Sequence, residues 1–138
     1  MDTAPFAVVG FYLALNALLL MALSFSVIGE RRGARISIGD GDNKKLAHRI
    51  RAQGNAAEYM PIFFLVMAMA AMLNISVWTL HIAGVVFTLG RFMHAYWFLK
   101  PSKNMKPRVF GMIMTTIAII ALSLRTLVQA IVIMVSGS

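Results

Sequence analysis

Four long apolar runs constrain this chain more than any other feature of its sequence. They cover residues 6–28, 52–73, 77–99 and 109–135, and each has close to the ~20 residues that a helix needs to cross a hydrocarbon layer of about 30 Å. Open sheets cannot span a bilayer because backbone groups there must be paired internally, and stretches such as VVFTLG lack the alternation of a β-barrel. With 59% hydrophobic residues and a mean hydropathy of +0.77, the chain is too apolar for a water-soluble domain. The sequence therefore predicts a single all-α integral membrane domain over residues 1–138, a bundle of four transmembrane helices.

The net charge of +8 is concentrated in two of the segments that connect the apolar runs. With four spans these two segments fall on the same side of the membrane, and the positive-inside rule places them in the cytoplasm with both termini on the opposite side. The distribution favours membrane topology and lipid headgroups over nucleic acid as the explanation for the basic charge. The basic residues are Arg31, Arg32, Arg35, Lys44, Lys45 and Arg49 in the first segment, and Lys100, Lys103, Lys106 and Arg108 in the second.

Polar side chains interrupt the start of the second run, in the stretch RIRAQGNAAEYMP. Arg51, Asn55 and Glu58 are spaced i, i+4, i+7, which predicts one stripe along a helix. The short connection near residue 75 makes the second and third helices antiparallel neighbours. Residues that are equally far from this connection in sequence, one on each helix, therefore lie at about the same depth in the membrane. Glu58 lies 17 residues before Ile75 and Arg91 lies 16 after it, which predicts a salt bridge between them or a ligand that they share.

The same count places Asn55 level with His94 on the third helix. Ionisable groups within a span are costly and usually face a partner or a wet cavity. One interpretation is packing, with a salt bridge and an interhelical hydrogen bond. The other is a polar pocket that opens to the cytoplasm, in which arginines hold carboxylates and Glu58 receives an ammonium group. The chain has no cysteine and no spacing typical of a metal site, so a thiol reaction would need a thiol supplied by the ligand.

These residues resemble a known family. The segment RAQGNAAEYMP resembles the second-helix motif R-x-x-x-N-x-x-E-x-x-P of the membrane-associated proteins in eicosanoid and glutathione metabolism, the MAPEG family, in the version found in leukotriene C4 synthase. The stretch from Gly90 to His94 resembles the third helix of that family. The four-span layout is similar to that of small bacterial members, which implies a bacterial inner membrane protein.

The resemblance implies a homotrimer that binds glutathione between neighbouring subunits at the cytoplasmic end. It assigns glutathione binding to Arg51, Gln53, Asn55, Glu58 and Tyr59. We add His94, which lies level with Asn55 in the expected pocket, as a further glutathione-binding residue, and we expect Arg91 to form a structural salt bridge or to support the site. The resemblance assigns catalysis to Arg108, which would stabilise the glutathione thiolate, and to Arg31 or Arg32, which would help to close the site. No metal is implied.

Three positions depart from the family pattern. His94 and Phe98 stand where several mammalian members have tyrosines, and Val109 stands where the prostaglandin synthase has a serine. The first hypothesis is a glutathione transferase or peroxidase acting on a lipophilic electrophile or hydroperoxide. The second is a membrane protein without turnover whose pocket holds a lipid headgroup or another anion. A transporter is disfavoured because the polar stripe stops at Glu58 and Arg91.

Overall fold

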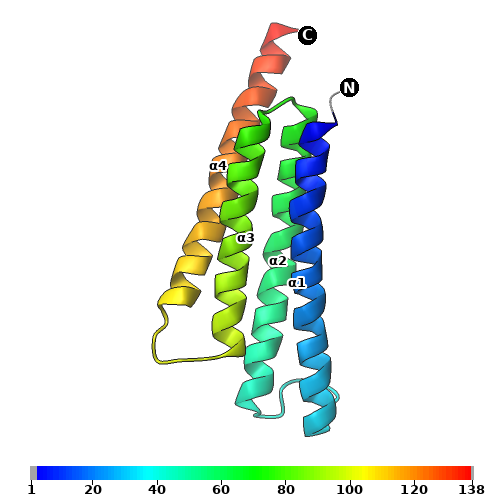
Figure 1. Ribbon diagram of the computed structural model, residues 1–138, viewed down its shortest axis with the longest axis vertical. Coiled ribbons are helices and arrows are strands. Elements are labelled where there is room, and N and C mark those ends of the chain that lie inside the picture. Colours follow the sequence, from blue (N-terminus) through cyan, green and yellow to red (C-terminus); the bar gives the residue numbers. More distant parts are fainter. Residues whose placement is uncertain (1–2, 138) are drawn as a thin grey trace.

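Four helices make up the computed structural model, which describes residues 3–137 (Figure 1). Each is long and apolar enough to cross a membrane, which confirms the predicted all-α membrane fold. Met1, Asp2 and Ser138, which the predicted domain includes, lie outside the described residues. The helices are α1 (Ala4–Ala34), α2 (Lys44–Met72), α3 (Val77–Leu99) and α4 (Lys106–Ser136).

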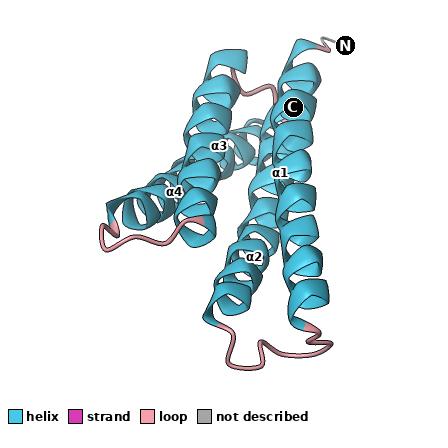
Figure 2. Cartoon of the chain, turned by 60° about the horizontal axis from the view of Figure 1, so that its bottom comes forward, coloured by secondary structure: helices cyan, strands magenta, loops and turns pink. Residues whose placement is uncertain are grey.

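The two longer connections, residues 35–43 and 100–105, lie at one end of the bundle, opposite the short α2–α3 turn (Figure 1). We call the end that carries both connections the basic end. Helices α2 and α3 form the centre of the packing, because each of them contacts the other three helices. Helix α4 packs on α3 and α2, and it makes no contact with α1 within residues 3–137 (Figure 2). Helix α4 therefore lies at the edge of the bundle, and only its face toward α2 and α3 is covered by other helices.

The helices on either side of the first connection extend beyond the apolar runs. Helix α1 continues to Ala34, so Arg31 and Arg32 belong to its last turn. Asn43 caps the start of α2, because its side-chain oxygen accepts hydrogen bonds from the backbone nitrogens of Lys45 and Leu46 at 3.0 and 3.1 Å. The basic residues thus project from ordered helical turns as well as from loops.

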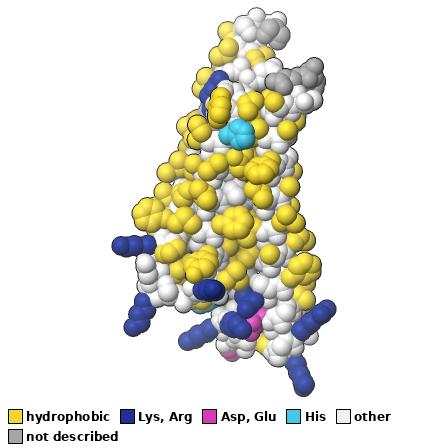
Figure 3. Space-filling model, viewed as in Figure 1, with side chains coloured by type: hydrophobic (Ala, Val, Ile, Leu, Met, Phe, Trp, Pro, Cys, Tyr) yellow, Lys and Arg dark blue, Asp and Glu magenta, His cyan; other side chains and the backbone are white. Residues whose placement is uncertain are grey.

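Ion pairs join α1 and α2 at the basic end. The Glu30 carboxylate lies 2.9 Å from Lys45 Nζ and 3.2 Å from Arg49 Nε. Arg49 Nη1 also donates a hydrogen bond to the Ser26 carbonyl oxygen at 3.2 Å. On the face shown in Figure 3, Lys and Arg side chains gather mostly around this end, and hydrophobic side chains cover the middle of the molecule.

Glycines let the helices approach closely where the polar residues lie. The Tyr12 ring of α1 occupies the space that a side chain at Gly84 would need. Helices α3 and α4 cross at Gly90 and Gly111, where a Cβ on Gly111 would lie 2.6 Å from the Gly90 carbonyl oxygen. This backbone contact packs the first turns of α4 against the half of α3 that lies nearer the basic end.

Candidate functional site

An open cavity of about 610 Å³ lies near the basic end, between α4 and the adjoining faces of α2 and α3. Three of the residues predicted for a site, Asn55, His94 and Arg108, lie along its wall. The rest of the wall comes mainly from apolar side chains of α4 and the connection before it. The remaining residues are Met105, Val109, Met112, Ile113, Thr116 and Ile117.

The rotation of α2 decides which polar side chains reach this cavity. At about 100° per residue, Arg51 and Glu58 lie within about 20° of each other around the helix. Asn55 is rotated by about 40–60° from them, toward the buried residues Ala52 and Ala56. Asn55 is therefore half-buried at the edge of the core, whereas Arg51 and Glu58 are exposed.

The salt bridge predicted between Glu58 and Arg91 is absent from the described residues. Glu58 forms no ion pair within residues 3–137, and Arg91 instead donates from Nη1 to Asn55 Oδ1 at 2.7 Å and to the Asn55 carbonyl oxygen at 3.3 Å. Counting residues from the α2–α3 turn placed Arg91 at nearly the right depth on α2, because Glu58 and Asn55 are less than one turn apart. Counting does not determine how α2 is rotated about its axis.

Arg91 is almost fully buried, with 2% of its surface exposed, and several groups contact its guanidinium. Its Nε donates to the Thr115 hydroxyl at 3.0 Å, and its guanidinium carbon lies 5.4 Å from the centre of the Tyr59 ring. Among the described residues no carboxylate lies within ion-pair distance of it. A buried positive charge thus lies behind Asn55, which is on the cavity wall, and neutral oxygens solvate that charge.

Arg108 comes to the cavity from the first turn of α4. Its guanidinium carbon lies 5.3 Å from the Trp97 ring centre and 5.0 Å from the Phe98 ring centre. Trp97 is itself fixed, because Nε1 donates to the Asn104 carbonyl oxygen at 3.0 Å. No described carboxylate pairs with Arg108. Aromatic faces hold the cation in place and leave its N–H groups free for an anionic ligand.

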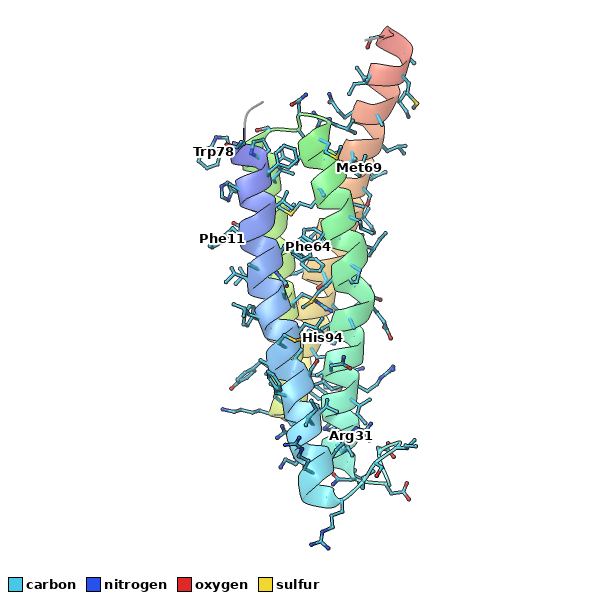
Figure 4. All side chains as sticks on the ribbon, turned by 90° about the vertical axis from the view of Figure 1, so that its right-hand side faces the viewer. Phe11, Arg31, Phe64, Met69, Trp78 and His94 are labelled. Carbon is cyan, nitrogen blue, oxygen red and sulfur yellow. The ribbon has the colours of Figure 1, made fainter. Side chains whose placement is uncertain are left out.

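His94 forms the α3 side of the cavity and is only 5% exposed. Its ring centre lies 5.1 Å from that of Phe98. Figure 4 shows His94 among the helices and Arg31 farther toward the end of α1. Asn55, His94 and Arg108 therefore combine a carboxamide, an imidazole and a guanidinium around one apolar cavity.

Other predicted residues lie away from this cavity within the single chain. Arg31 donates to the Gly39 carbonyl oxygen at 2.8 Å and, with Arg32 and Arg35, lines a separate hollow of about 420 Å³. Gln53 lies about 160° from Asn55 around α2, so the two side chains cannot share one wall. Within the single chain, the predicted residues therefore do not all lie around one cavity.

Sequence reasoning missed Thr115, which is fully buried and binds Arg91. A signal was present, because Gly111 and Thr115 are small residues spaced i, i+4 within an otherwise bulky apolar run. Such spacing is typical of close helix packing in membranes. It does not reveal which residue the threonine contacts.

Comparison with known proteins adds two findings. The model of the MAPEG family matches residues 9–128. Two curated relatives, both called inner membrane protein YecN and both from Escherichia coli (strain K12 and strain O6:H1), are 44% identical over 87 residues. That match covers 63% of this chain and 66% of each relative, just under two thirds of its length.

Proposed function

The chain belongs to the MAPEG family of membrane proteins, and from this premise we propose that it binds glutathione and presents its thiolate to lipophilic electrophiles or hydroperoxides. The observation that carries the proposal is the single cavity that unites Asn55, His94 and Arg108 at the basic end. The protein has no cysteine, so glutathione supplies the thiol for the chemistry.

The donor set fits a zwitterionic tripeptide. Arg51 is suited to bind a glutathione carboxylate and Glu58 its ammonium group, while Asn55 and His94 offer hydrogen bonds to the peptide. Gln53 and Tyr59 complete the set that the family motif assigns. In the single chain Arg51 and Glu58 are exposed and Gln53 lies on another flank, which supports a site shared between copies. We propose a homotrimer in which Arg31 or Arg32 of a neighbouring copy helps to close that site.

Arg108 has the properties required to stabilise a thiolate. A nearby guanidinium favours the charged form of a thiol, and the thiolate is the nucleophile. Arg108 is half-buried and has no described carboxylate to neutralise it. Val109, Met112 and Ile113 form an apolar wall beside it, where a lipophilic co-substrate from the bilayer can bind.

We propose that the basic end faces the cytoplasm and that both termini face the other side. Because the chain has no native cysteine, single Ser→Cys variants test this orientation cleanly. In intact cells a membrane-impermeant maleimide is expected to label Ser76→Cys in the α2–α3 turn. It should label Ser102→Cys only after lysis. The reverse pattern would contradict the orientation.

Replacing Arg51 by alanine is expected to weaken glutathione binding, because a charged hydrogen bond to a ligand carboxylate contributes about 1.5–3 kcal/mol. This corresponds to about a 10- to 150-fold increase in Kd, measured by titration calorimetry in detergent. Arg35→Ala is a matched control, because Arg35 is also exposed and basic but is not part of the family motif. Equal losses in the two variants would indicate general charge attraction and not a specific site.

A second candidate is a protein that holds a lipid headgroup or another anion without turnover. Phe98 and Val109 favour it, because neither offers a hydroxyl to a bound thiolate, and the hollow beside Arg31, Arg32 and Arg35 suits an anionic headgroup. A protein of this kind binds anionic lipid vesicles but neither binds glutathione nor conjugates electrophiles. The two candidates therefore give opposite results in a glutathione titration.

A further inference from the structure

A chain of hydrogen bonds runs from the backbone of α4 to the wall of the cavity. The Thr115 hydroxyl donates to the Gly111 carbonyl oxygen at 2.8 Å and accepts from Arg91 Nε at 3.0 Å. Arg91 Nη1 then donates to Asn55 Oδ1 at 2.7 Å. Three helices are linked in sequence, and the last member lies on the cavity wall.

This chain of bonds fixes the polarity of Asn55. A guanidinium has donors only, so the atom of the carboxamide that faces Arg91 must be its oxygen. The nitrogen Nδ2, with two donor hydrogens, is left over, and no group among the described residues accepts a hydrogen bond from it. Asn55 lines the cavity, so Nδ2 is the side-chain donor that it has available for a ligand there.

Thr115 determines where the Arg91 guanidinium sits. The guanidinium is a rigid fork, so the hydrogen bond at Nε sets the direction in which Nη1 points. Both side chains are almost fully buried, and no described carboxylate competes for the cation. The close approach of Gly90 and Gly111 keeps α4 near enough for the Thr115 hydroxyl to reach Arg91.

We infer that Thr115 is a positioning residue that acts through Arg91 to hold the Asn55 amide as a hydrogen-bond donor toward the cavity. The ligand group that meets Asn55 is then an acceptor, a carboxylate or a peptide carbonyl. Naming that ligand as glutathione rests on the proposed function, whereas the orientation of Asn55 does not.

Two matched variants of Thr115 test the inference. Thr115→Val keeps the shape of the side chain and removes its hydroxyl, and we expect glutathione affinity to fall about three- to tenfold. Thr115→Ser keeps the hydroxyl and should stay within about twofold of the wild type, although it removes a methyl group from the packing. A role in packing alone predicts the opposite order. Asn55→Asp replaces the NH2 group of the side-chain amide with an oxygen. Because the donor is then lost, glutathione binding should weaken about tenfold or more.

A readout without ligand separates this inference from the proposed function. The side-chain amide of Asn55 is observed by NMR in detergent, in protein made with isotope-labelled asparagine, and is assigned by its loss in Asn55→Asp. Thr115→Val should shift this signal and speed its exchange with solvent, and Thr115→Ser should not. An unchanged signal in Thr115→Val overturns the inference. A shifted signal in a protein that does not bind glutathione supports the inference and contradicts the proposed function.

Discussion

Replacing Arg108 by alanine is expected to lower the turnover of glutathione with an electrophile about 100- to 1,000-fold, which is the usual cost of removing one group that stabilises developing charge. The affinity for glutathione should change much less, because Arg51, Asn55 and Glu58 remain to bind its charged and peptide groups. The expected signature is a large loss in kcat with a small change in the glutathione Kd.

Two variants serve as controls for Arg108→Ala. Arg125→Ala removes an exposed arginine whose side chain bonds Gln129 on the same helix, and it should leave turnover unchanged. Arg108→Lys keeps the charge but loses the planar stacking on Trp97 and Phe98, so an intermediate activity is expected. If Arg108→Ala turns over at the wild-type rate, Arg108 does not stabilise the thiolate.

Gly111→Ala is expected to have the largest effect on stability. The added Cβ would lie 2.6 Å from the Gly90 carbonyl oxygen and 2.7 Å from the His94 backbone nitrogen. Both atoms belong to the backbone of α3, so α3 and α4 must move apart. Overpacking of this kind costs about 1–3 kcal/mol or more. The movement should also break the bond from Arg91 to Thr115 and so weaken glutathione binding.

Thermal unfolding in detergent, followed by circular dichroism, measures this effect. Gly10→Ala is the matched control, because Gly10 also lies within a helix but, apart from its own helix backbone, no described atom lies within 4 Å of the position of an added Cβ. It should leave the midpoint unchanged or raise it slightly through better helix propensity. A Gly111→Ala midpoint equal to that of Gly10→Ala would contradict the close packing of α3 on α4.

The helices were predictable because a single physical rule governs them. Backbone groups in lipid must be paired internally, so apolar runs of sufficient length become helices whatever their neighbours are. The ends were less predictable, since α1 continues to Ala34, beyond the predicted boundary at residue 28. Outside the hydrocarbon layer, capping decides where a helix stops, and α1 ends where the backbone of Arg35 turns left-handed.

The site was predictable in composition but not in its pairings. Motif spacing identified Asn55, and counting from the α2–α3 turn brought it level with His94, which lines the same cavity. Counting also paired Glu58 with Arg91, whereas the structure pairs Asn55 with Arg91. A difference of three residues changes depth by only about 4.5 Å but rotates the side chain by about 60°, and rotation depends on packing that the sequence does not reveal.

The spacing of Gly111 and Thr115 predicts close helix packing, but the role of Thr115 was beyond prediction for a different reason. Its contact with Arg91 depends on the crossing of α3 and α4 at Gly90 and Gly111, which is set by the fit of two helix surfaces and not by any local pattern. The position of Arg31 is likewise decided by the loop that it binds, through the Gly39 carbonyl oxygen.

The central claim is that the cavity holds glutathione as a thiolate beside Arg108. The most direct test is the ultraviolet difference spectrum of glutathione mixed with the protein in detergent at neutral pH, where free glutathione is almost entirely in the thiol form. We expect a thiolate absorbance band that saturates with glutathione for the wild type and is absent for Arg108→Ala. A wild-type spectrum that matches that of free glutathione at every concentration would contradict the claim.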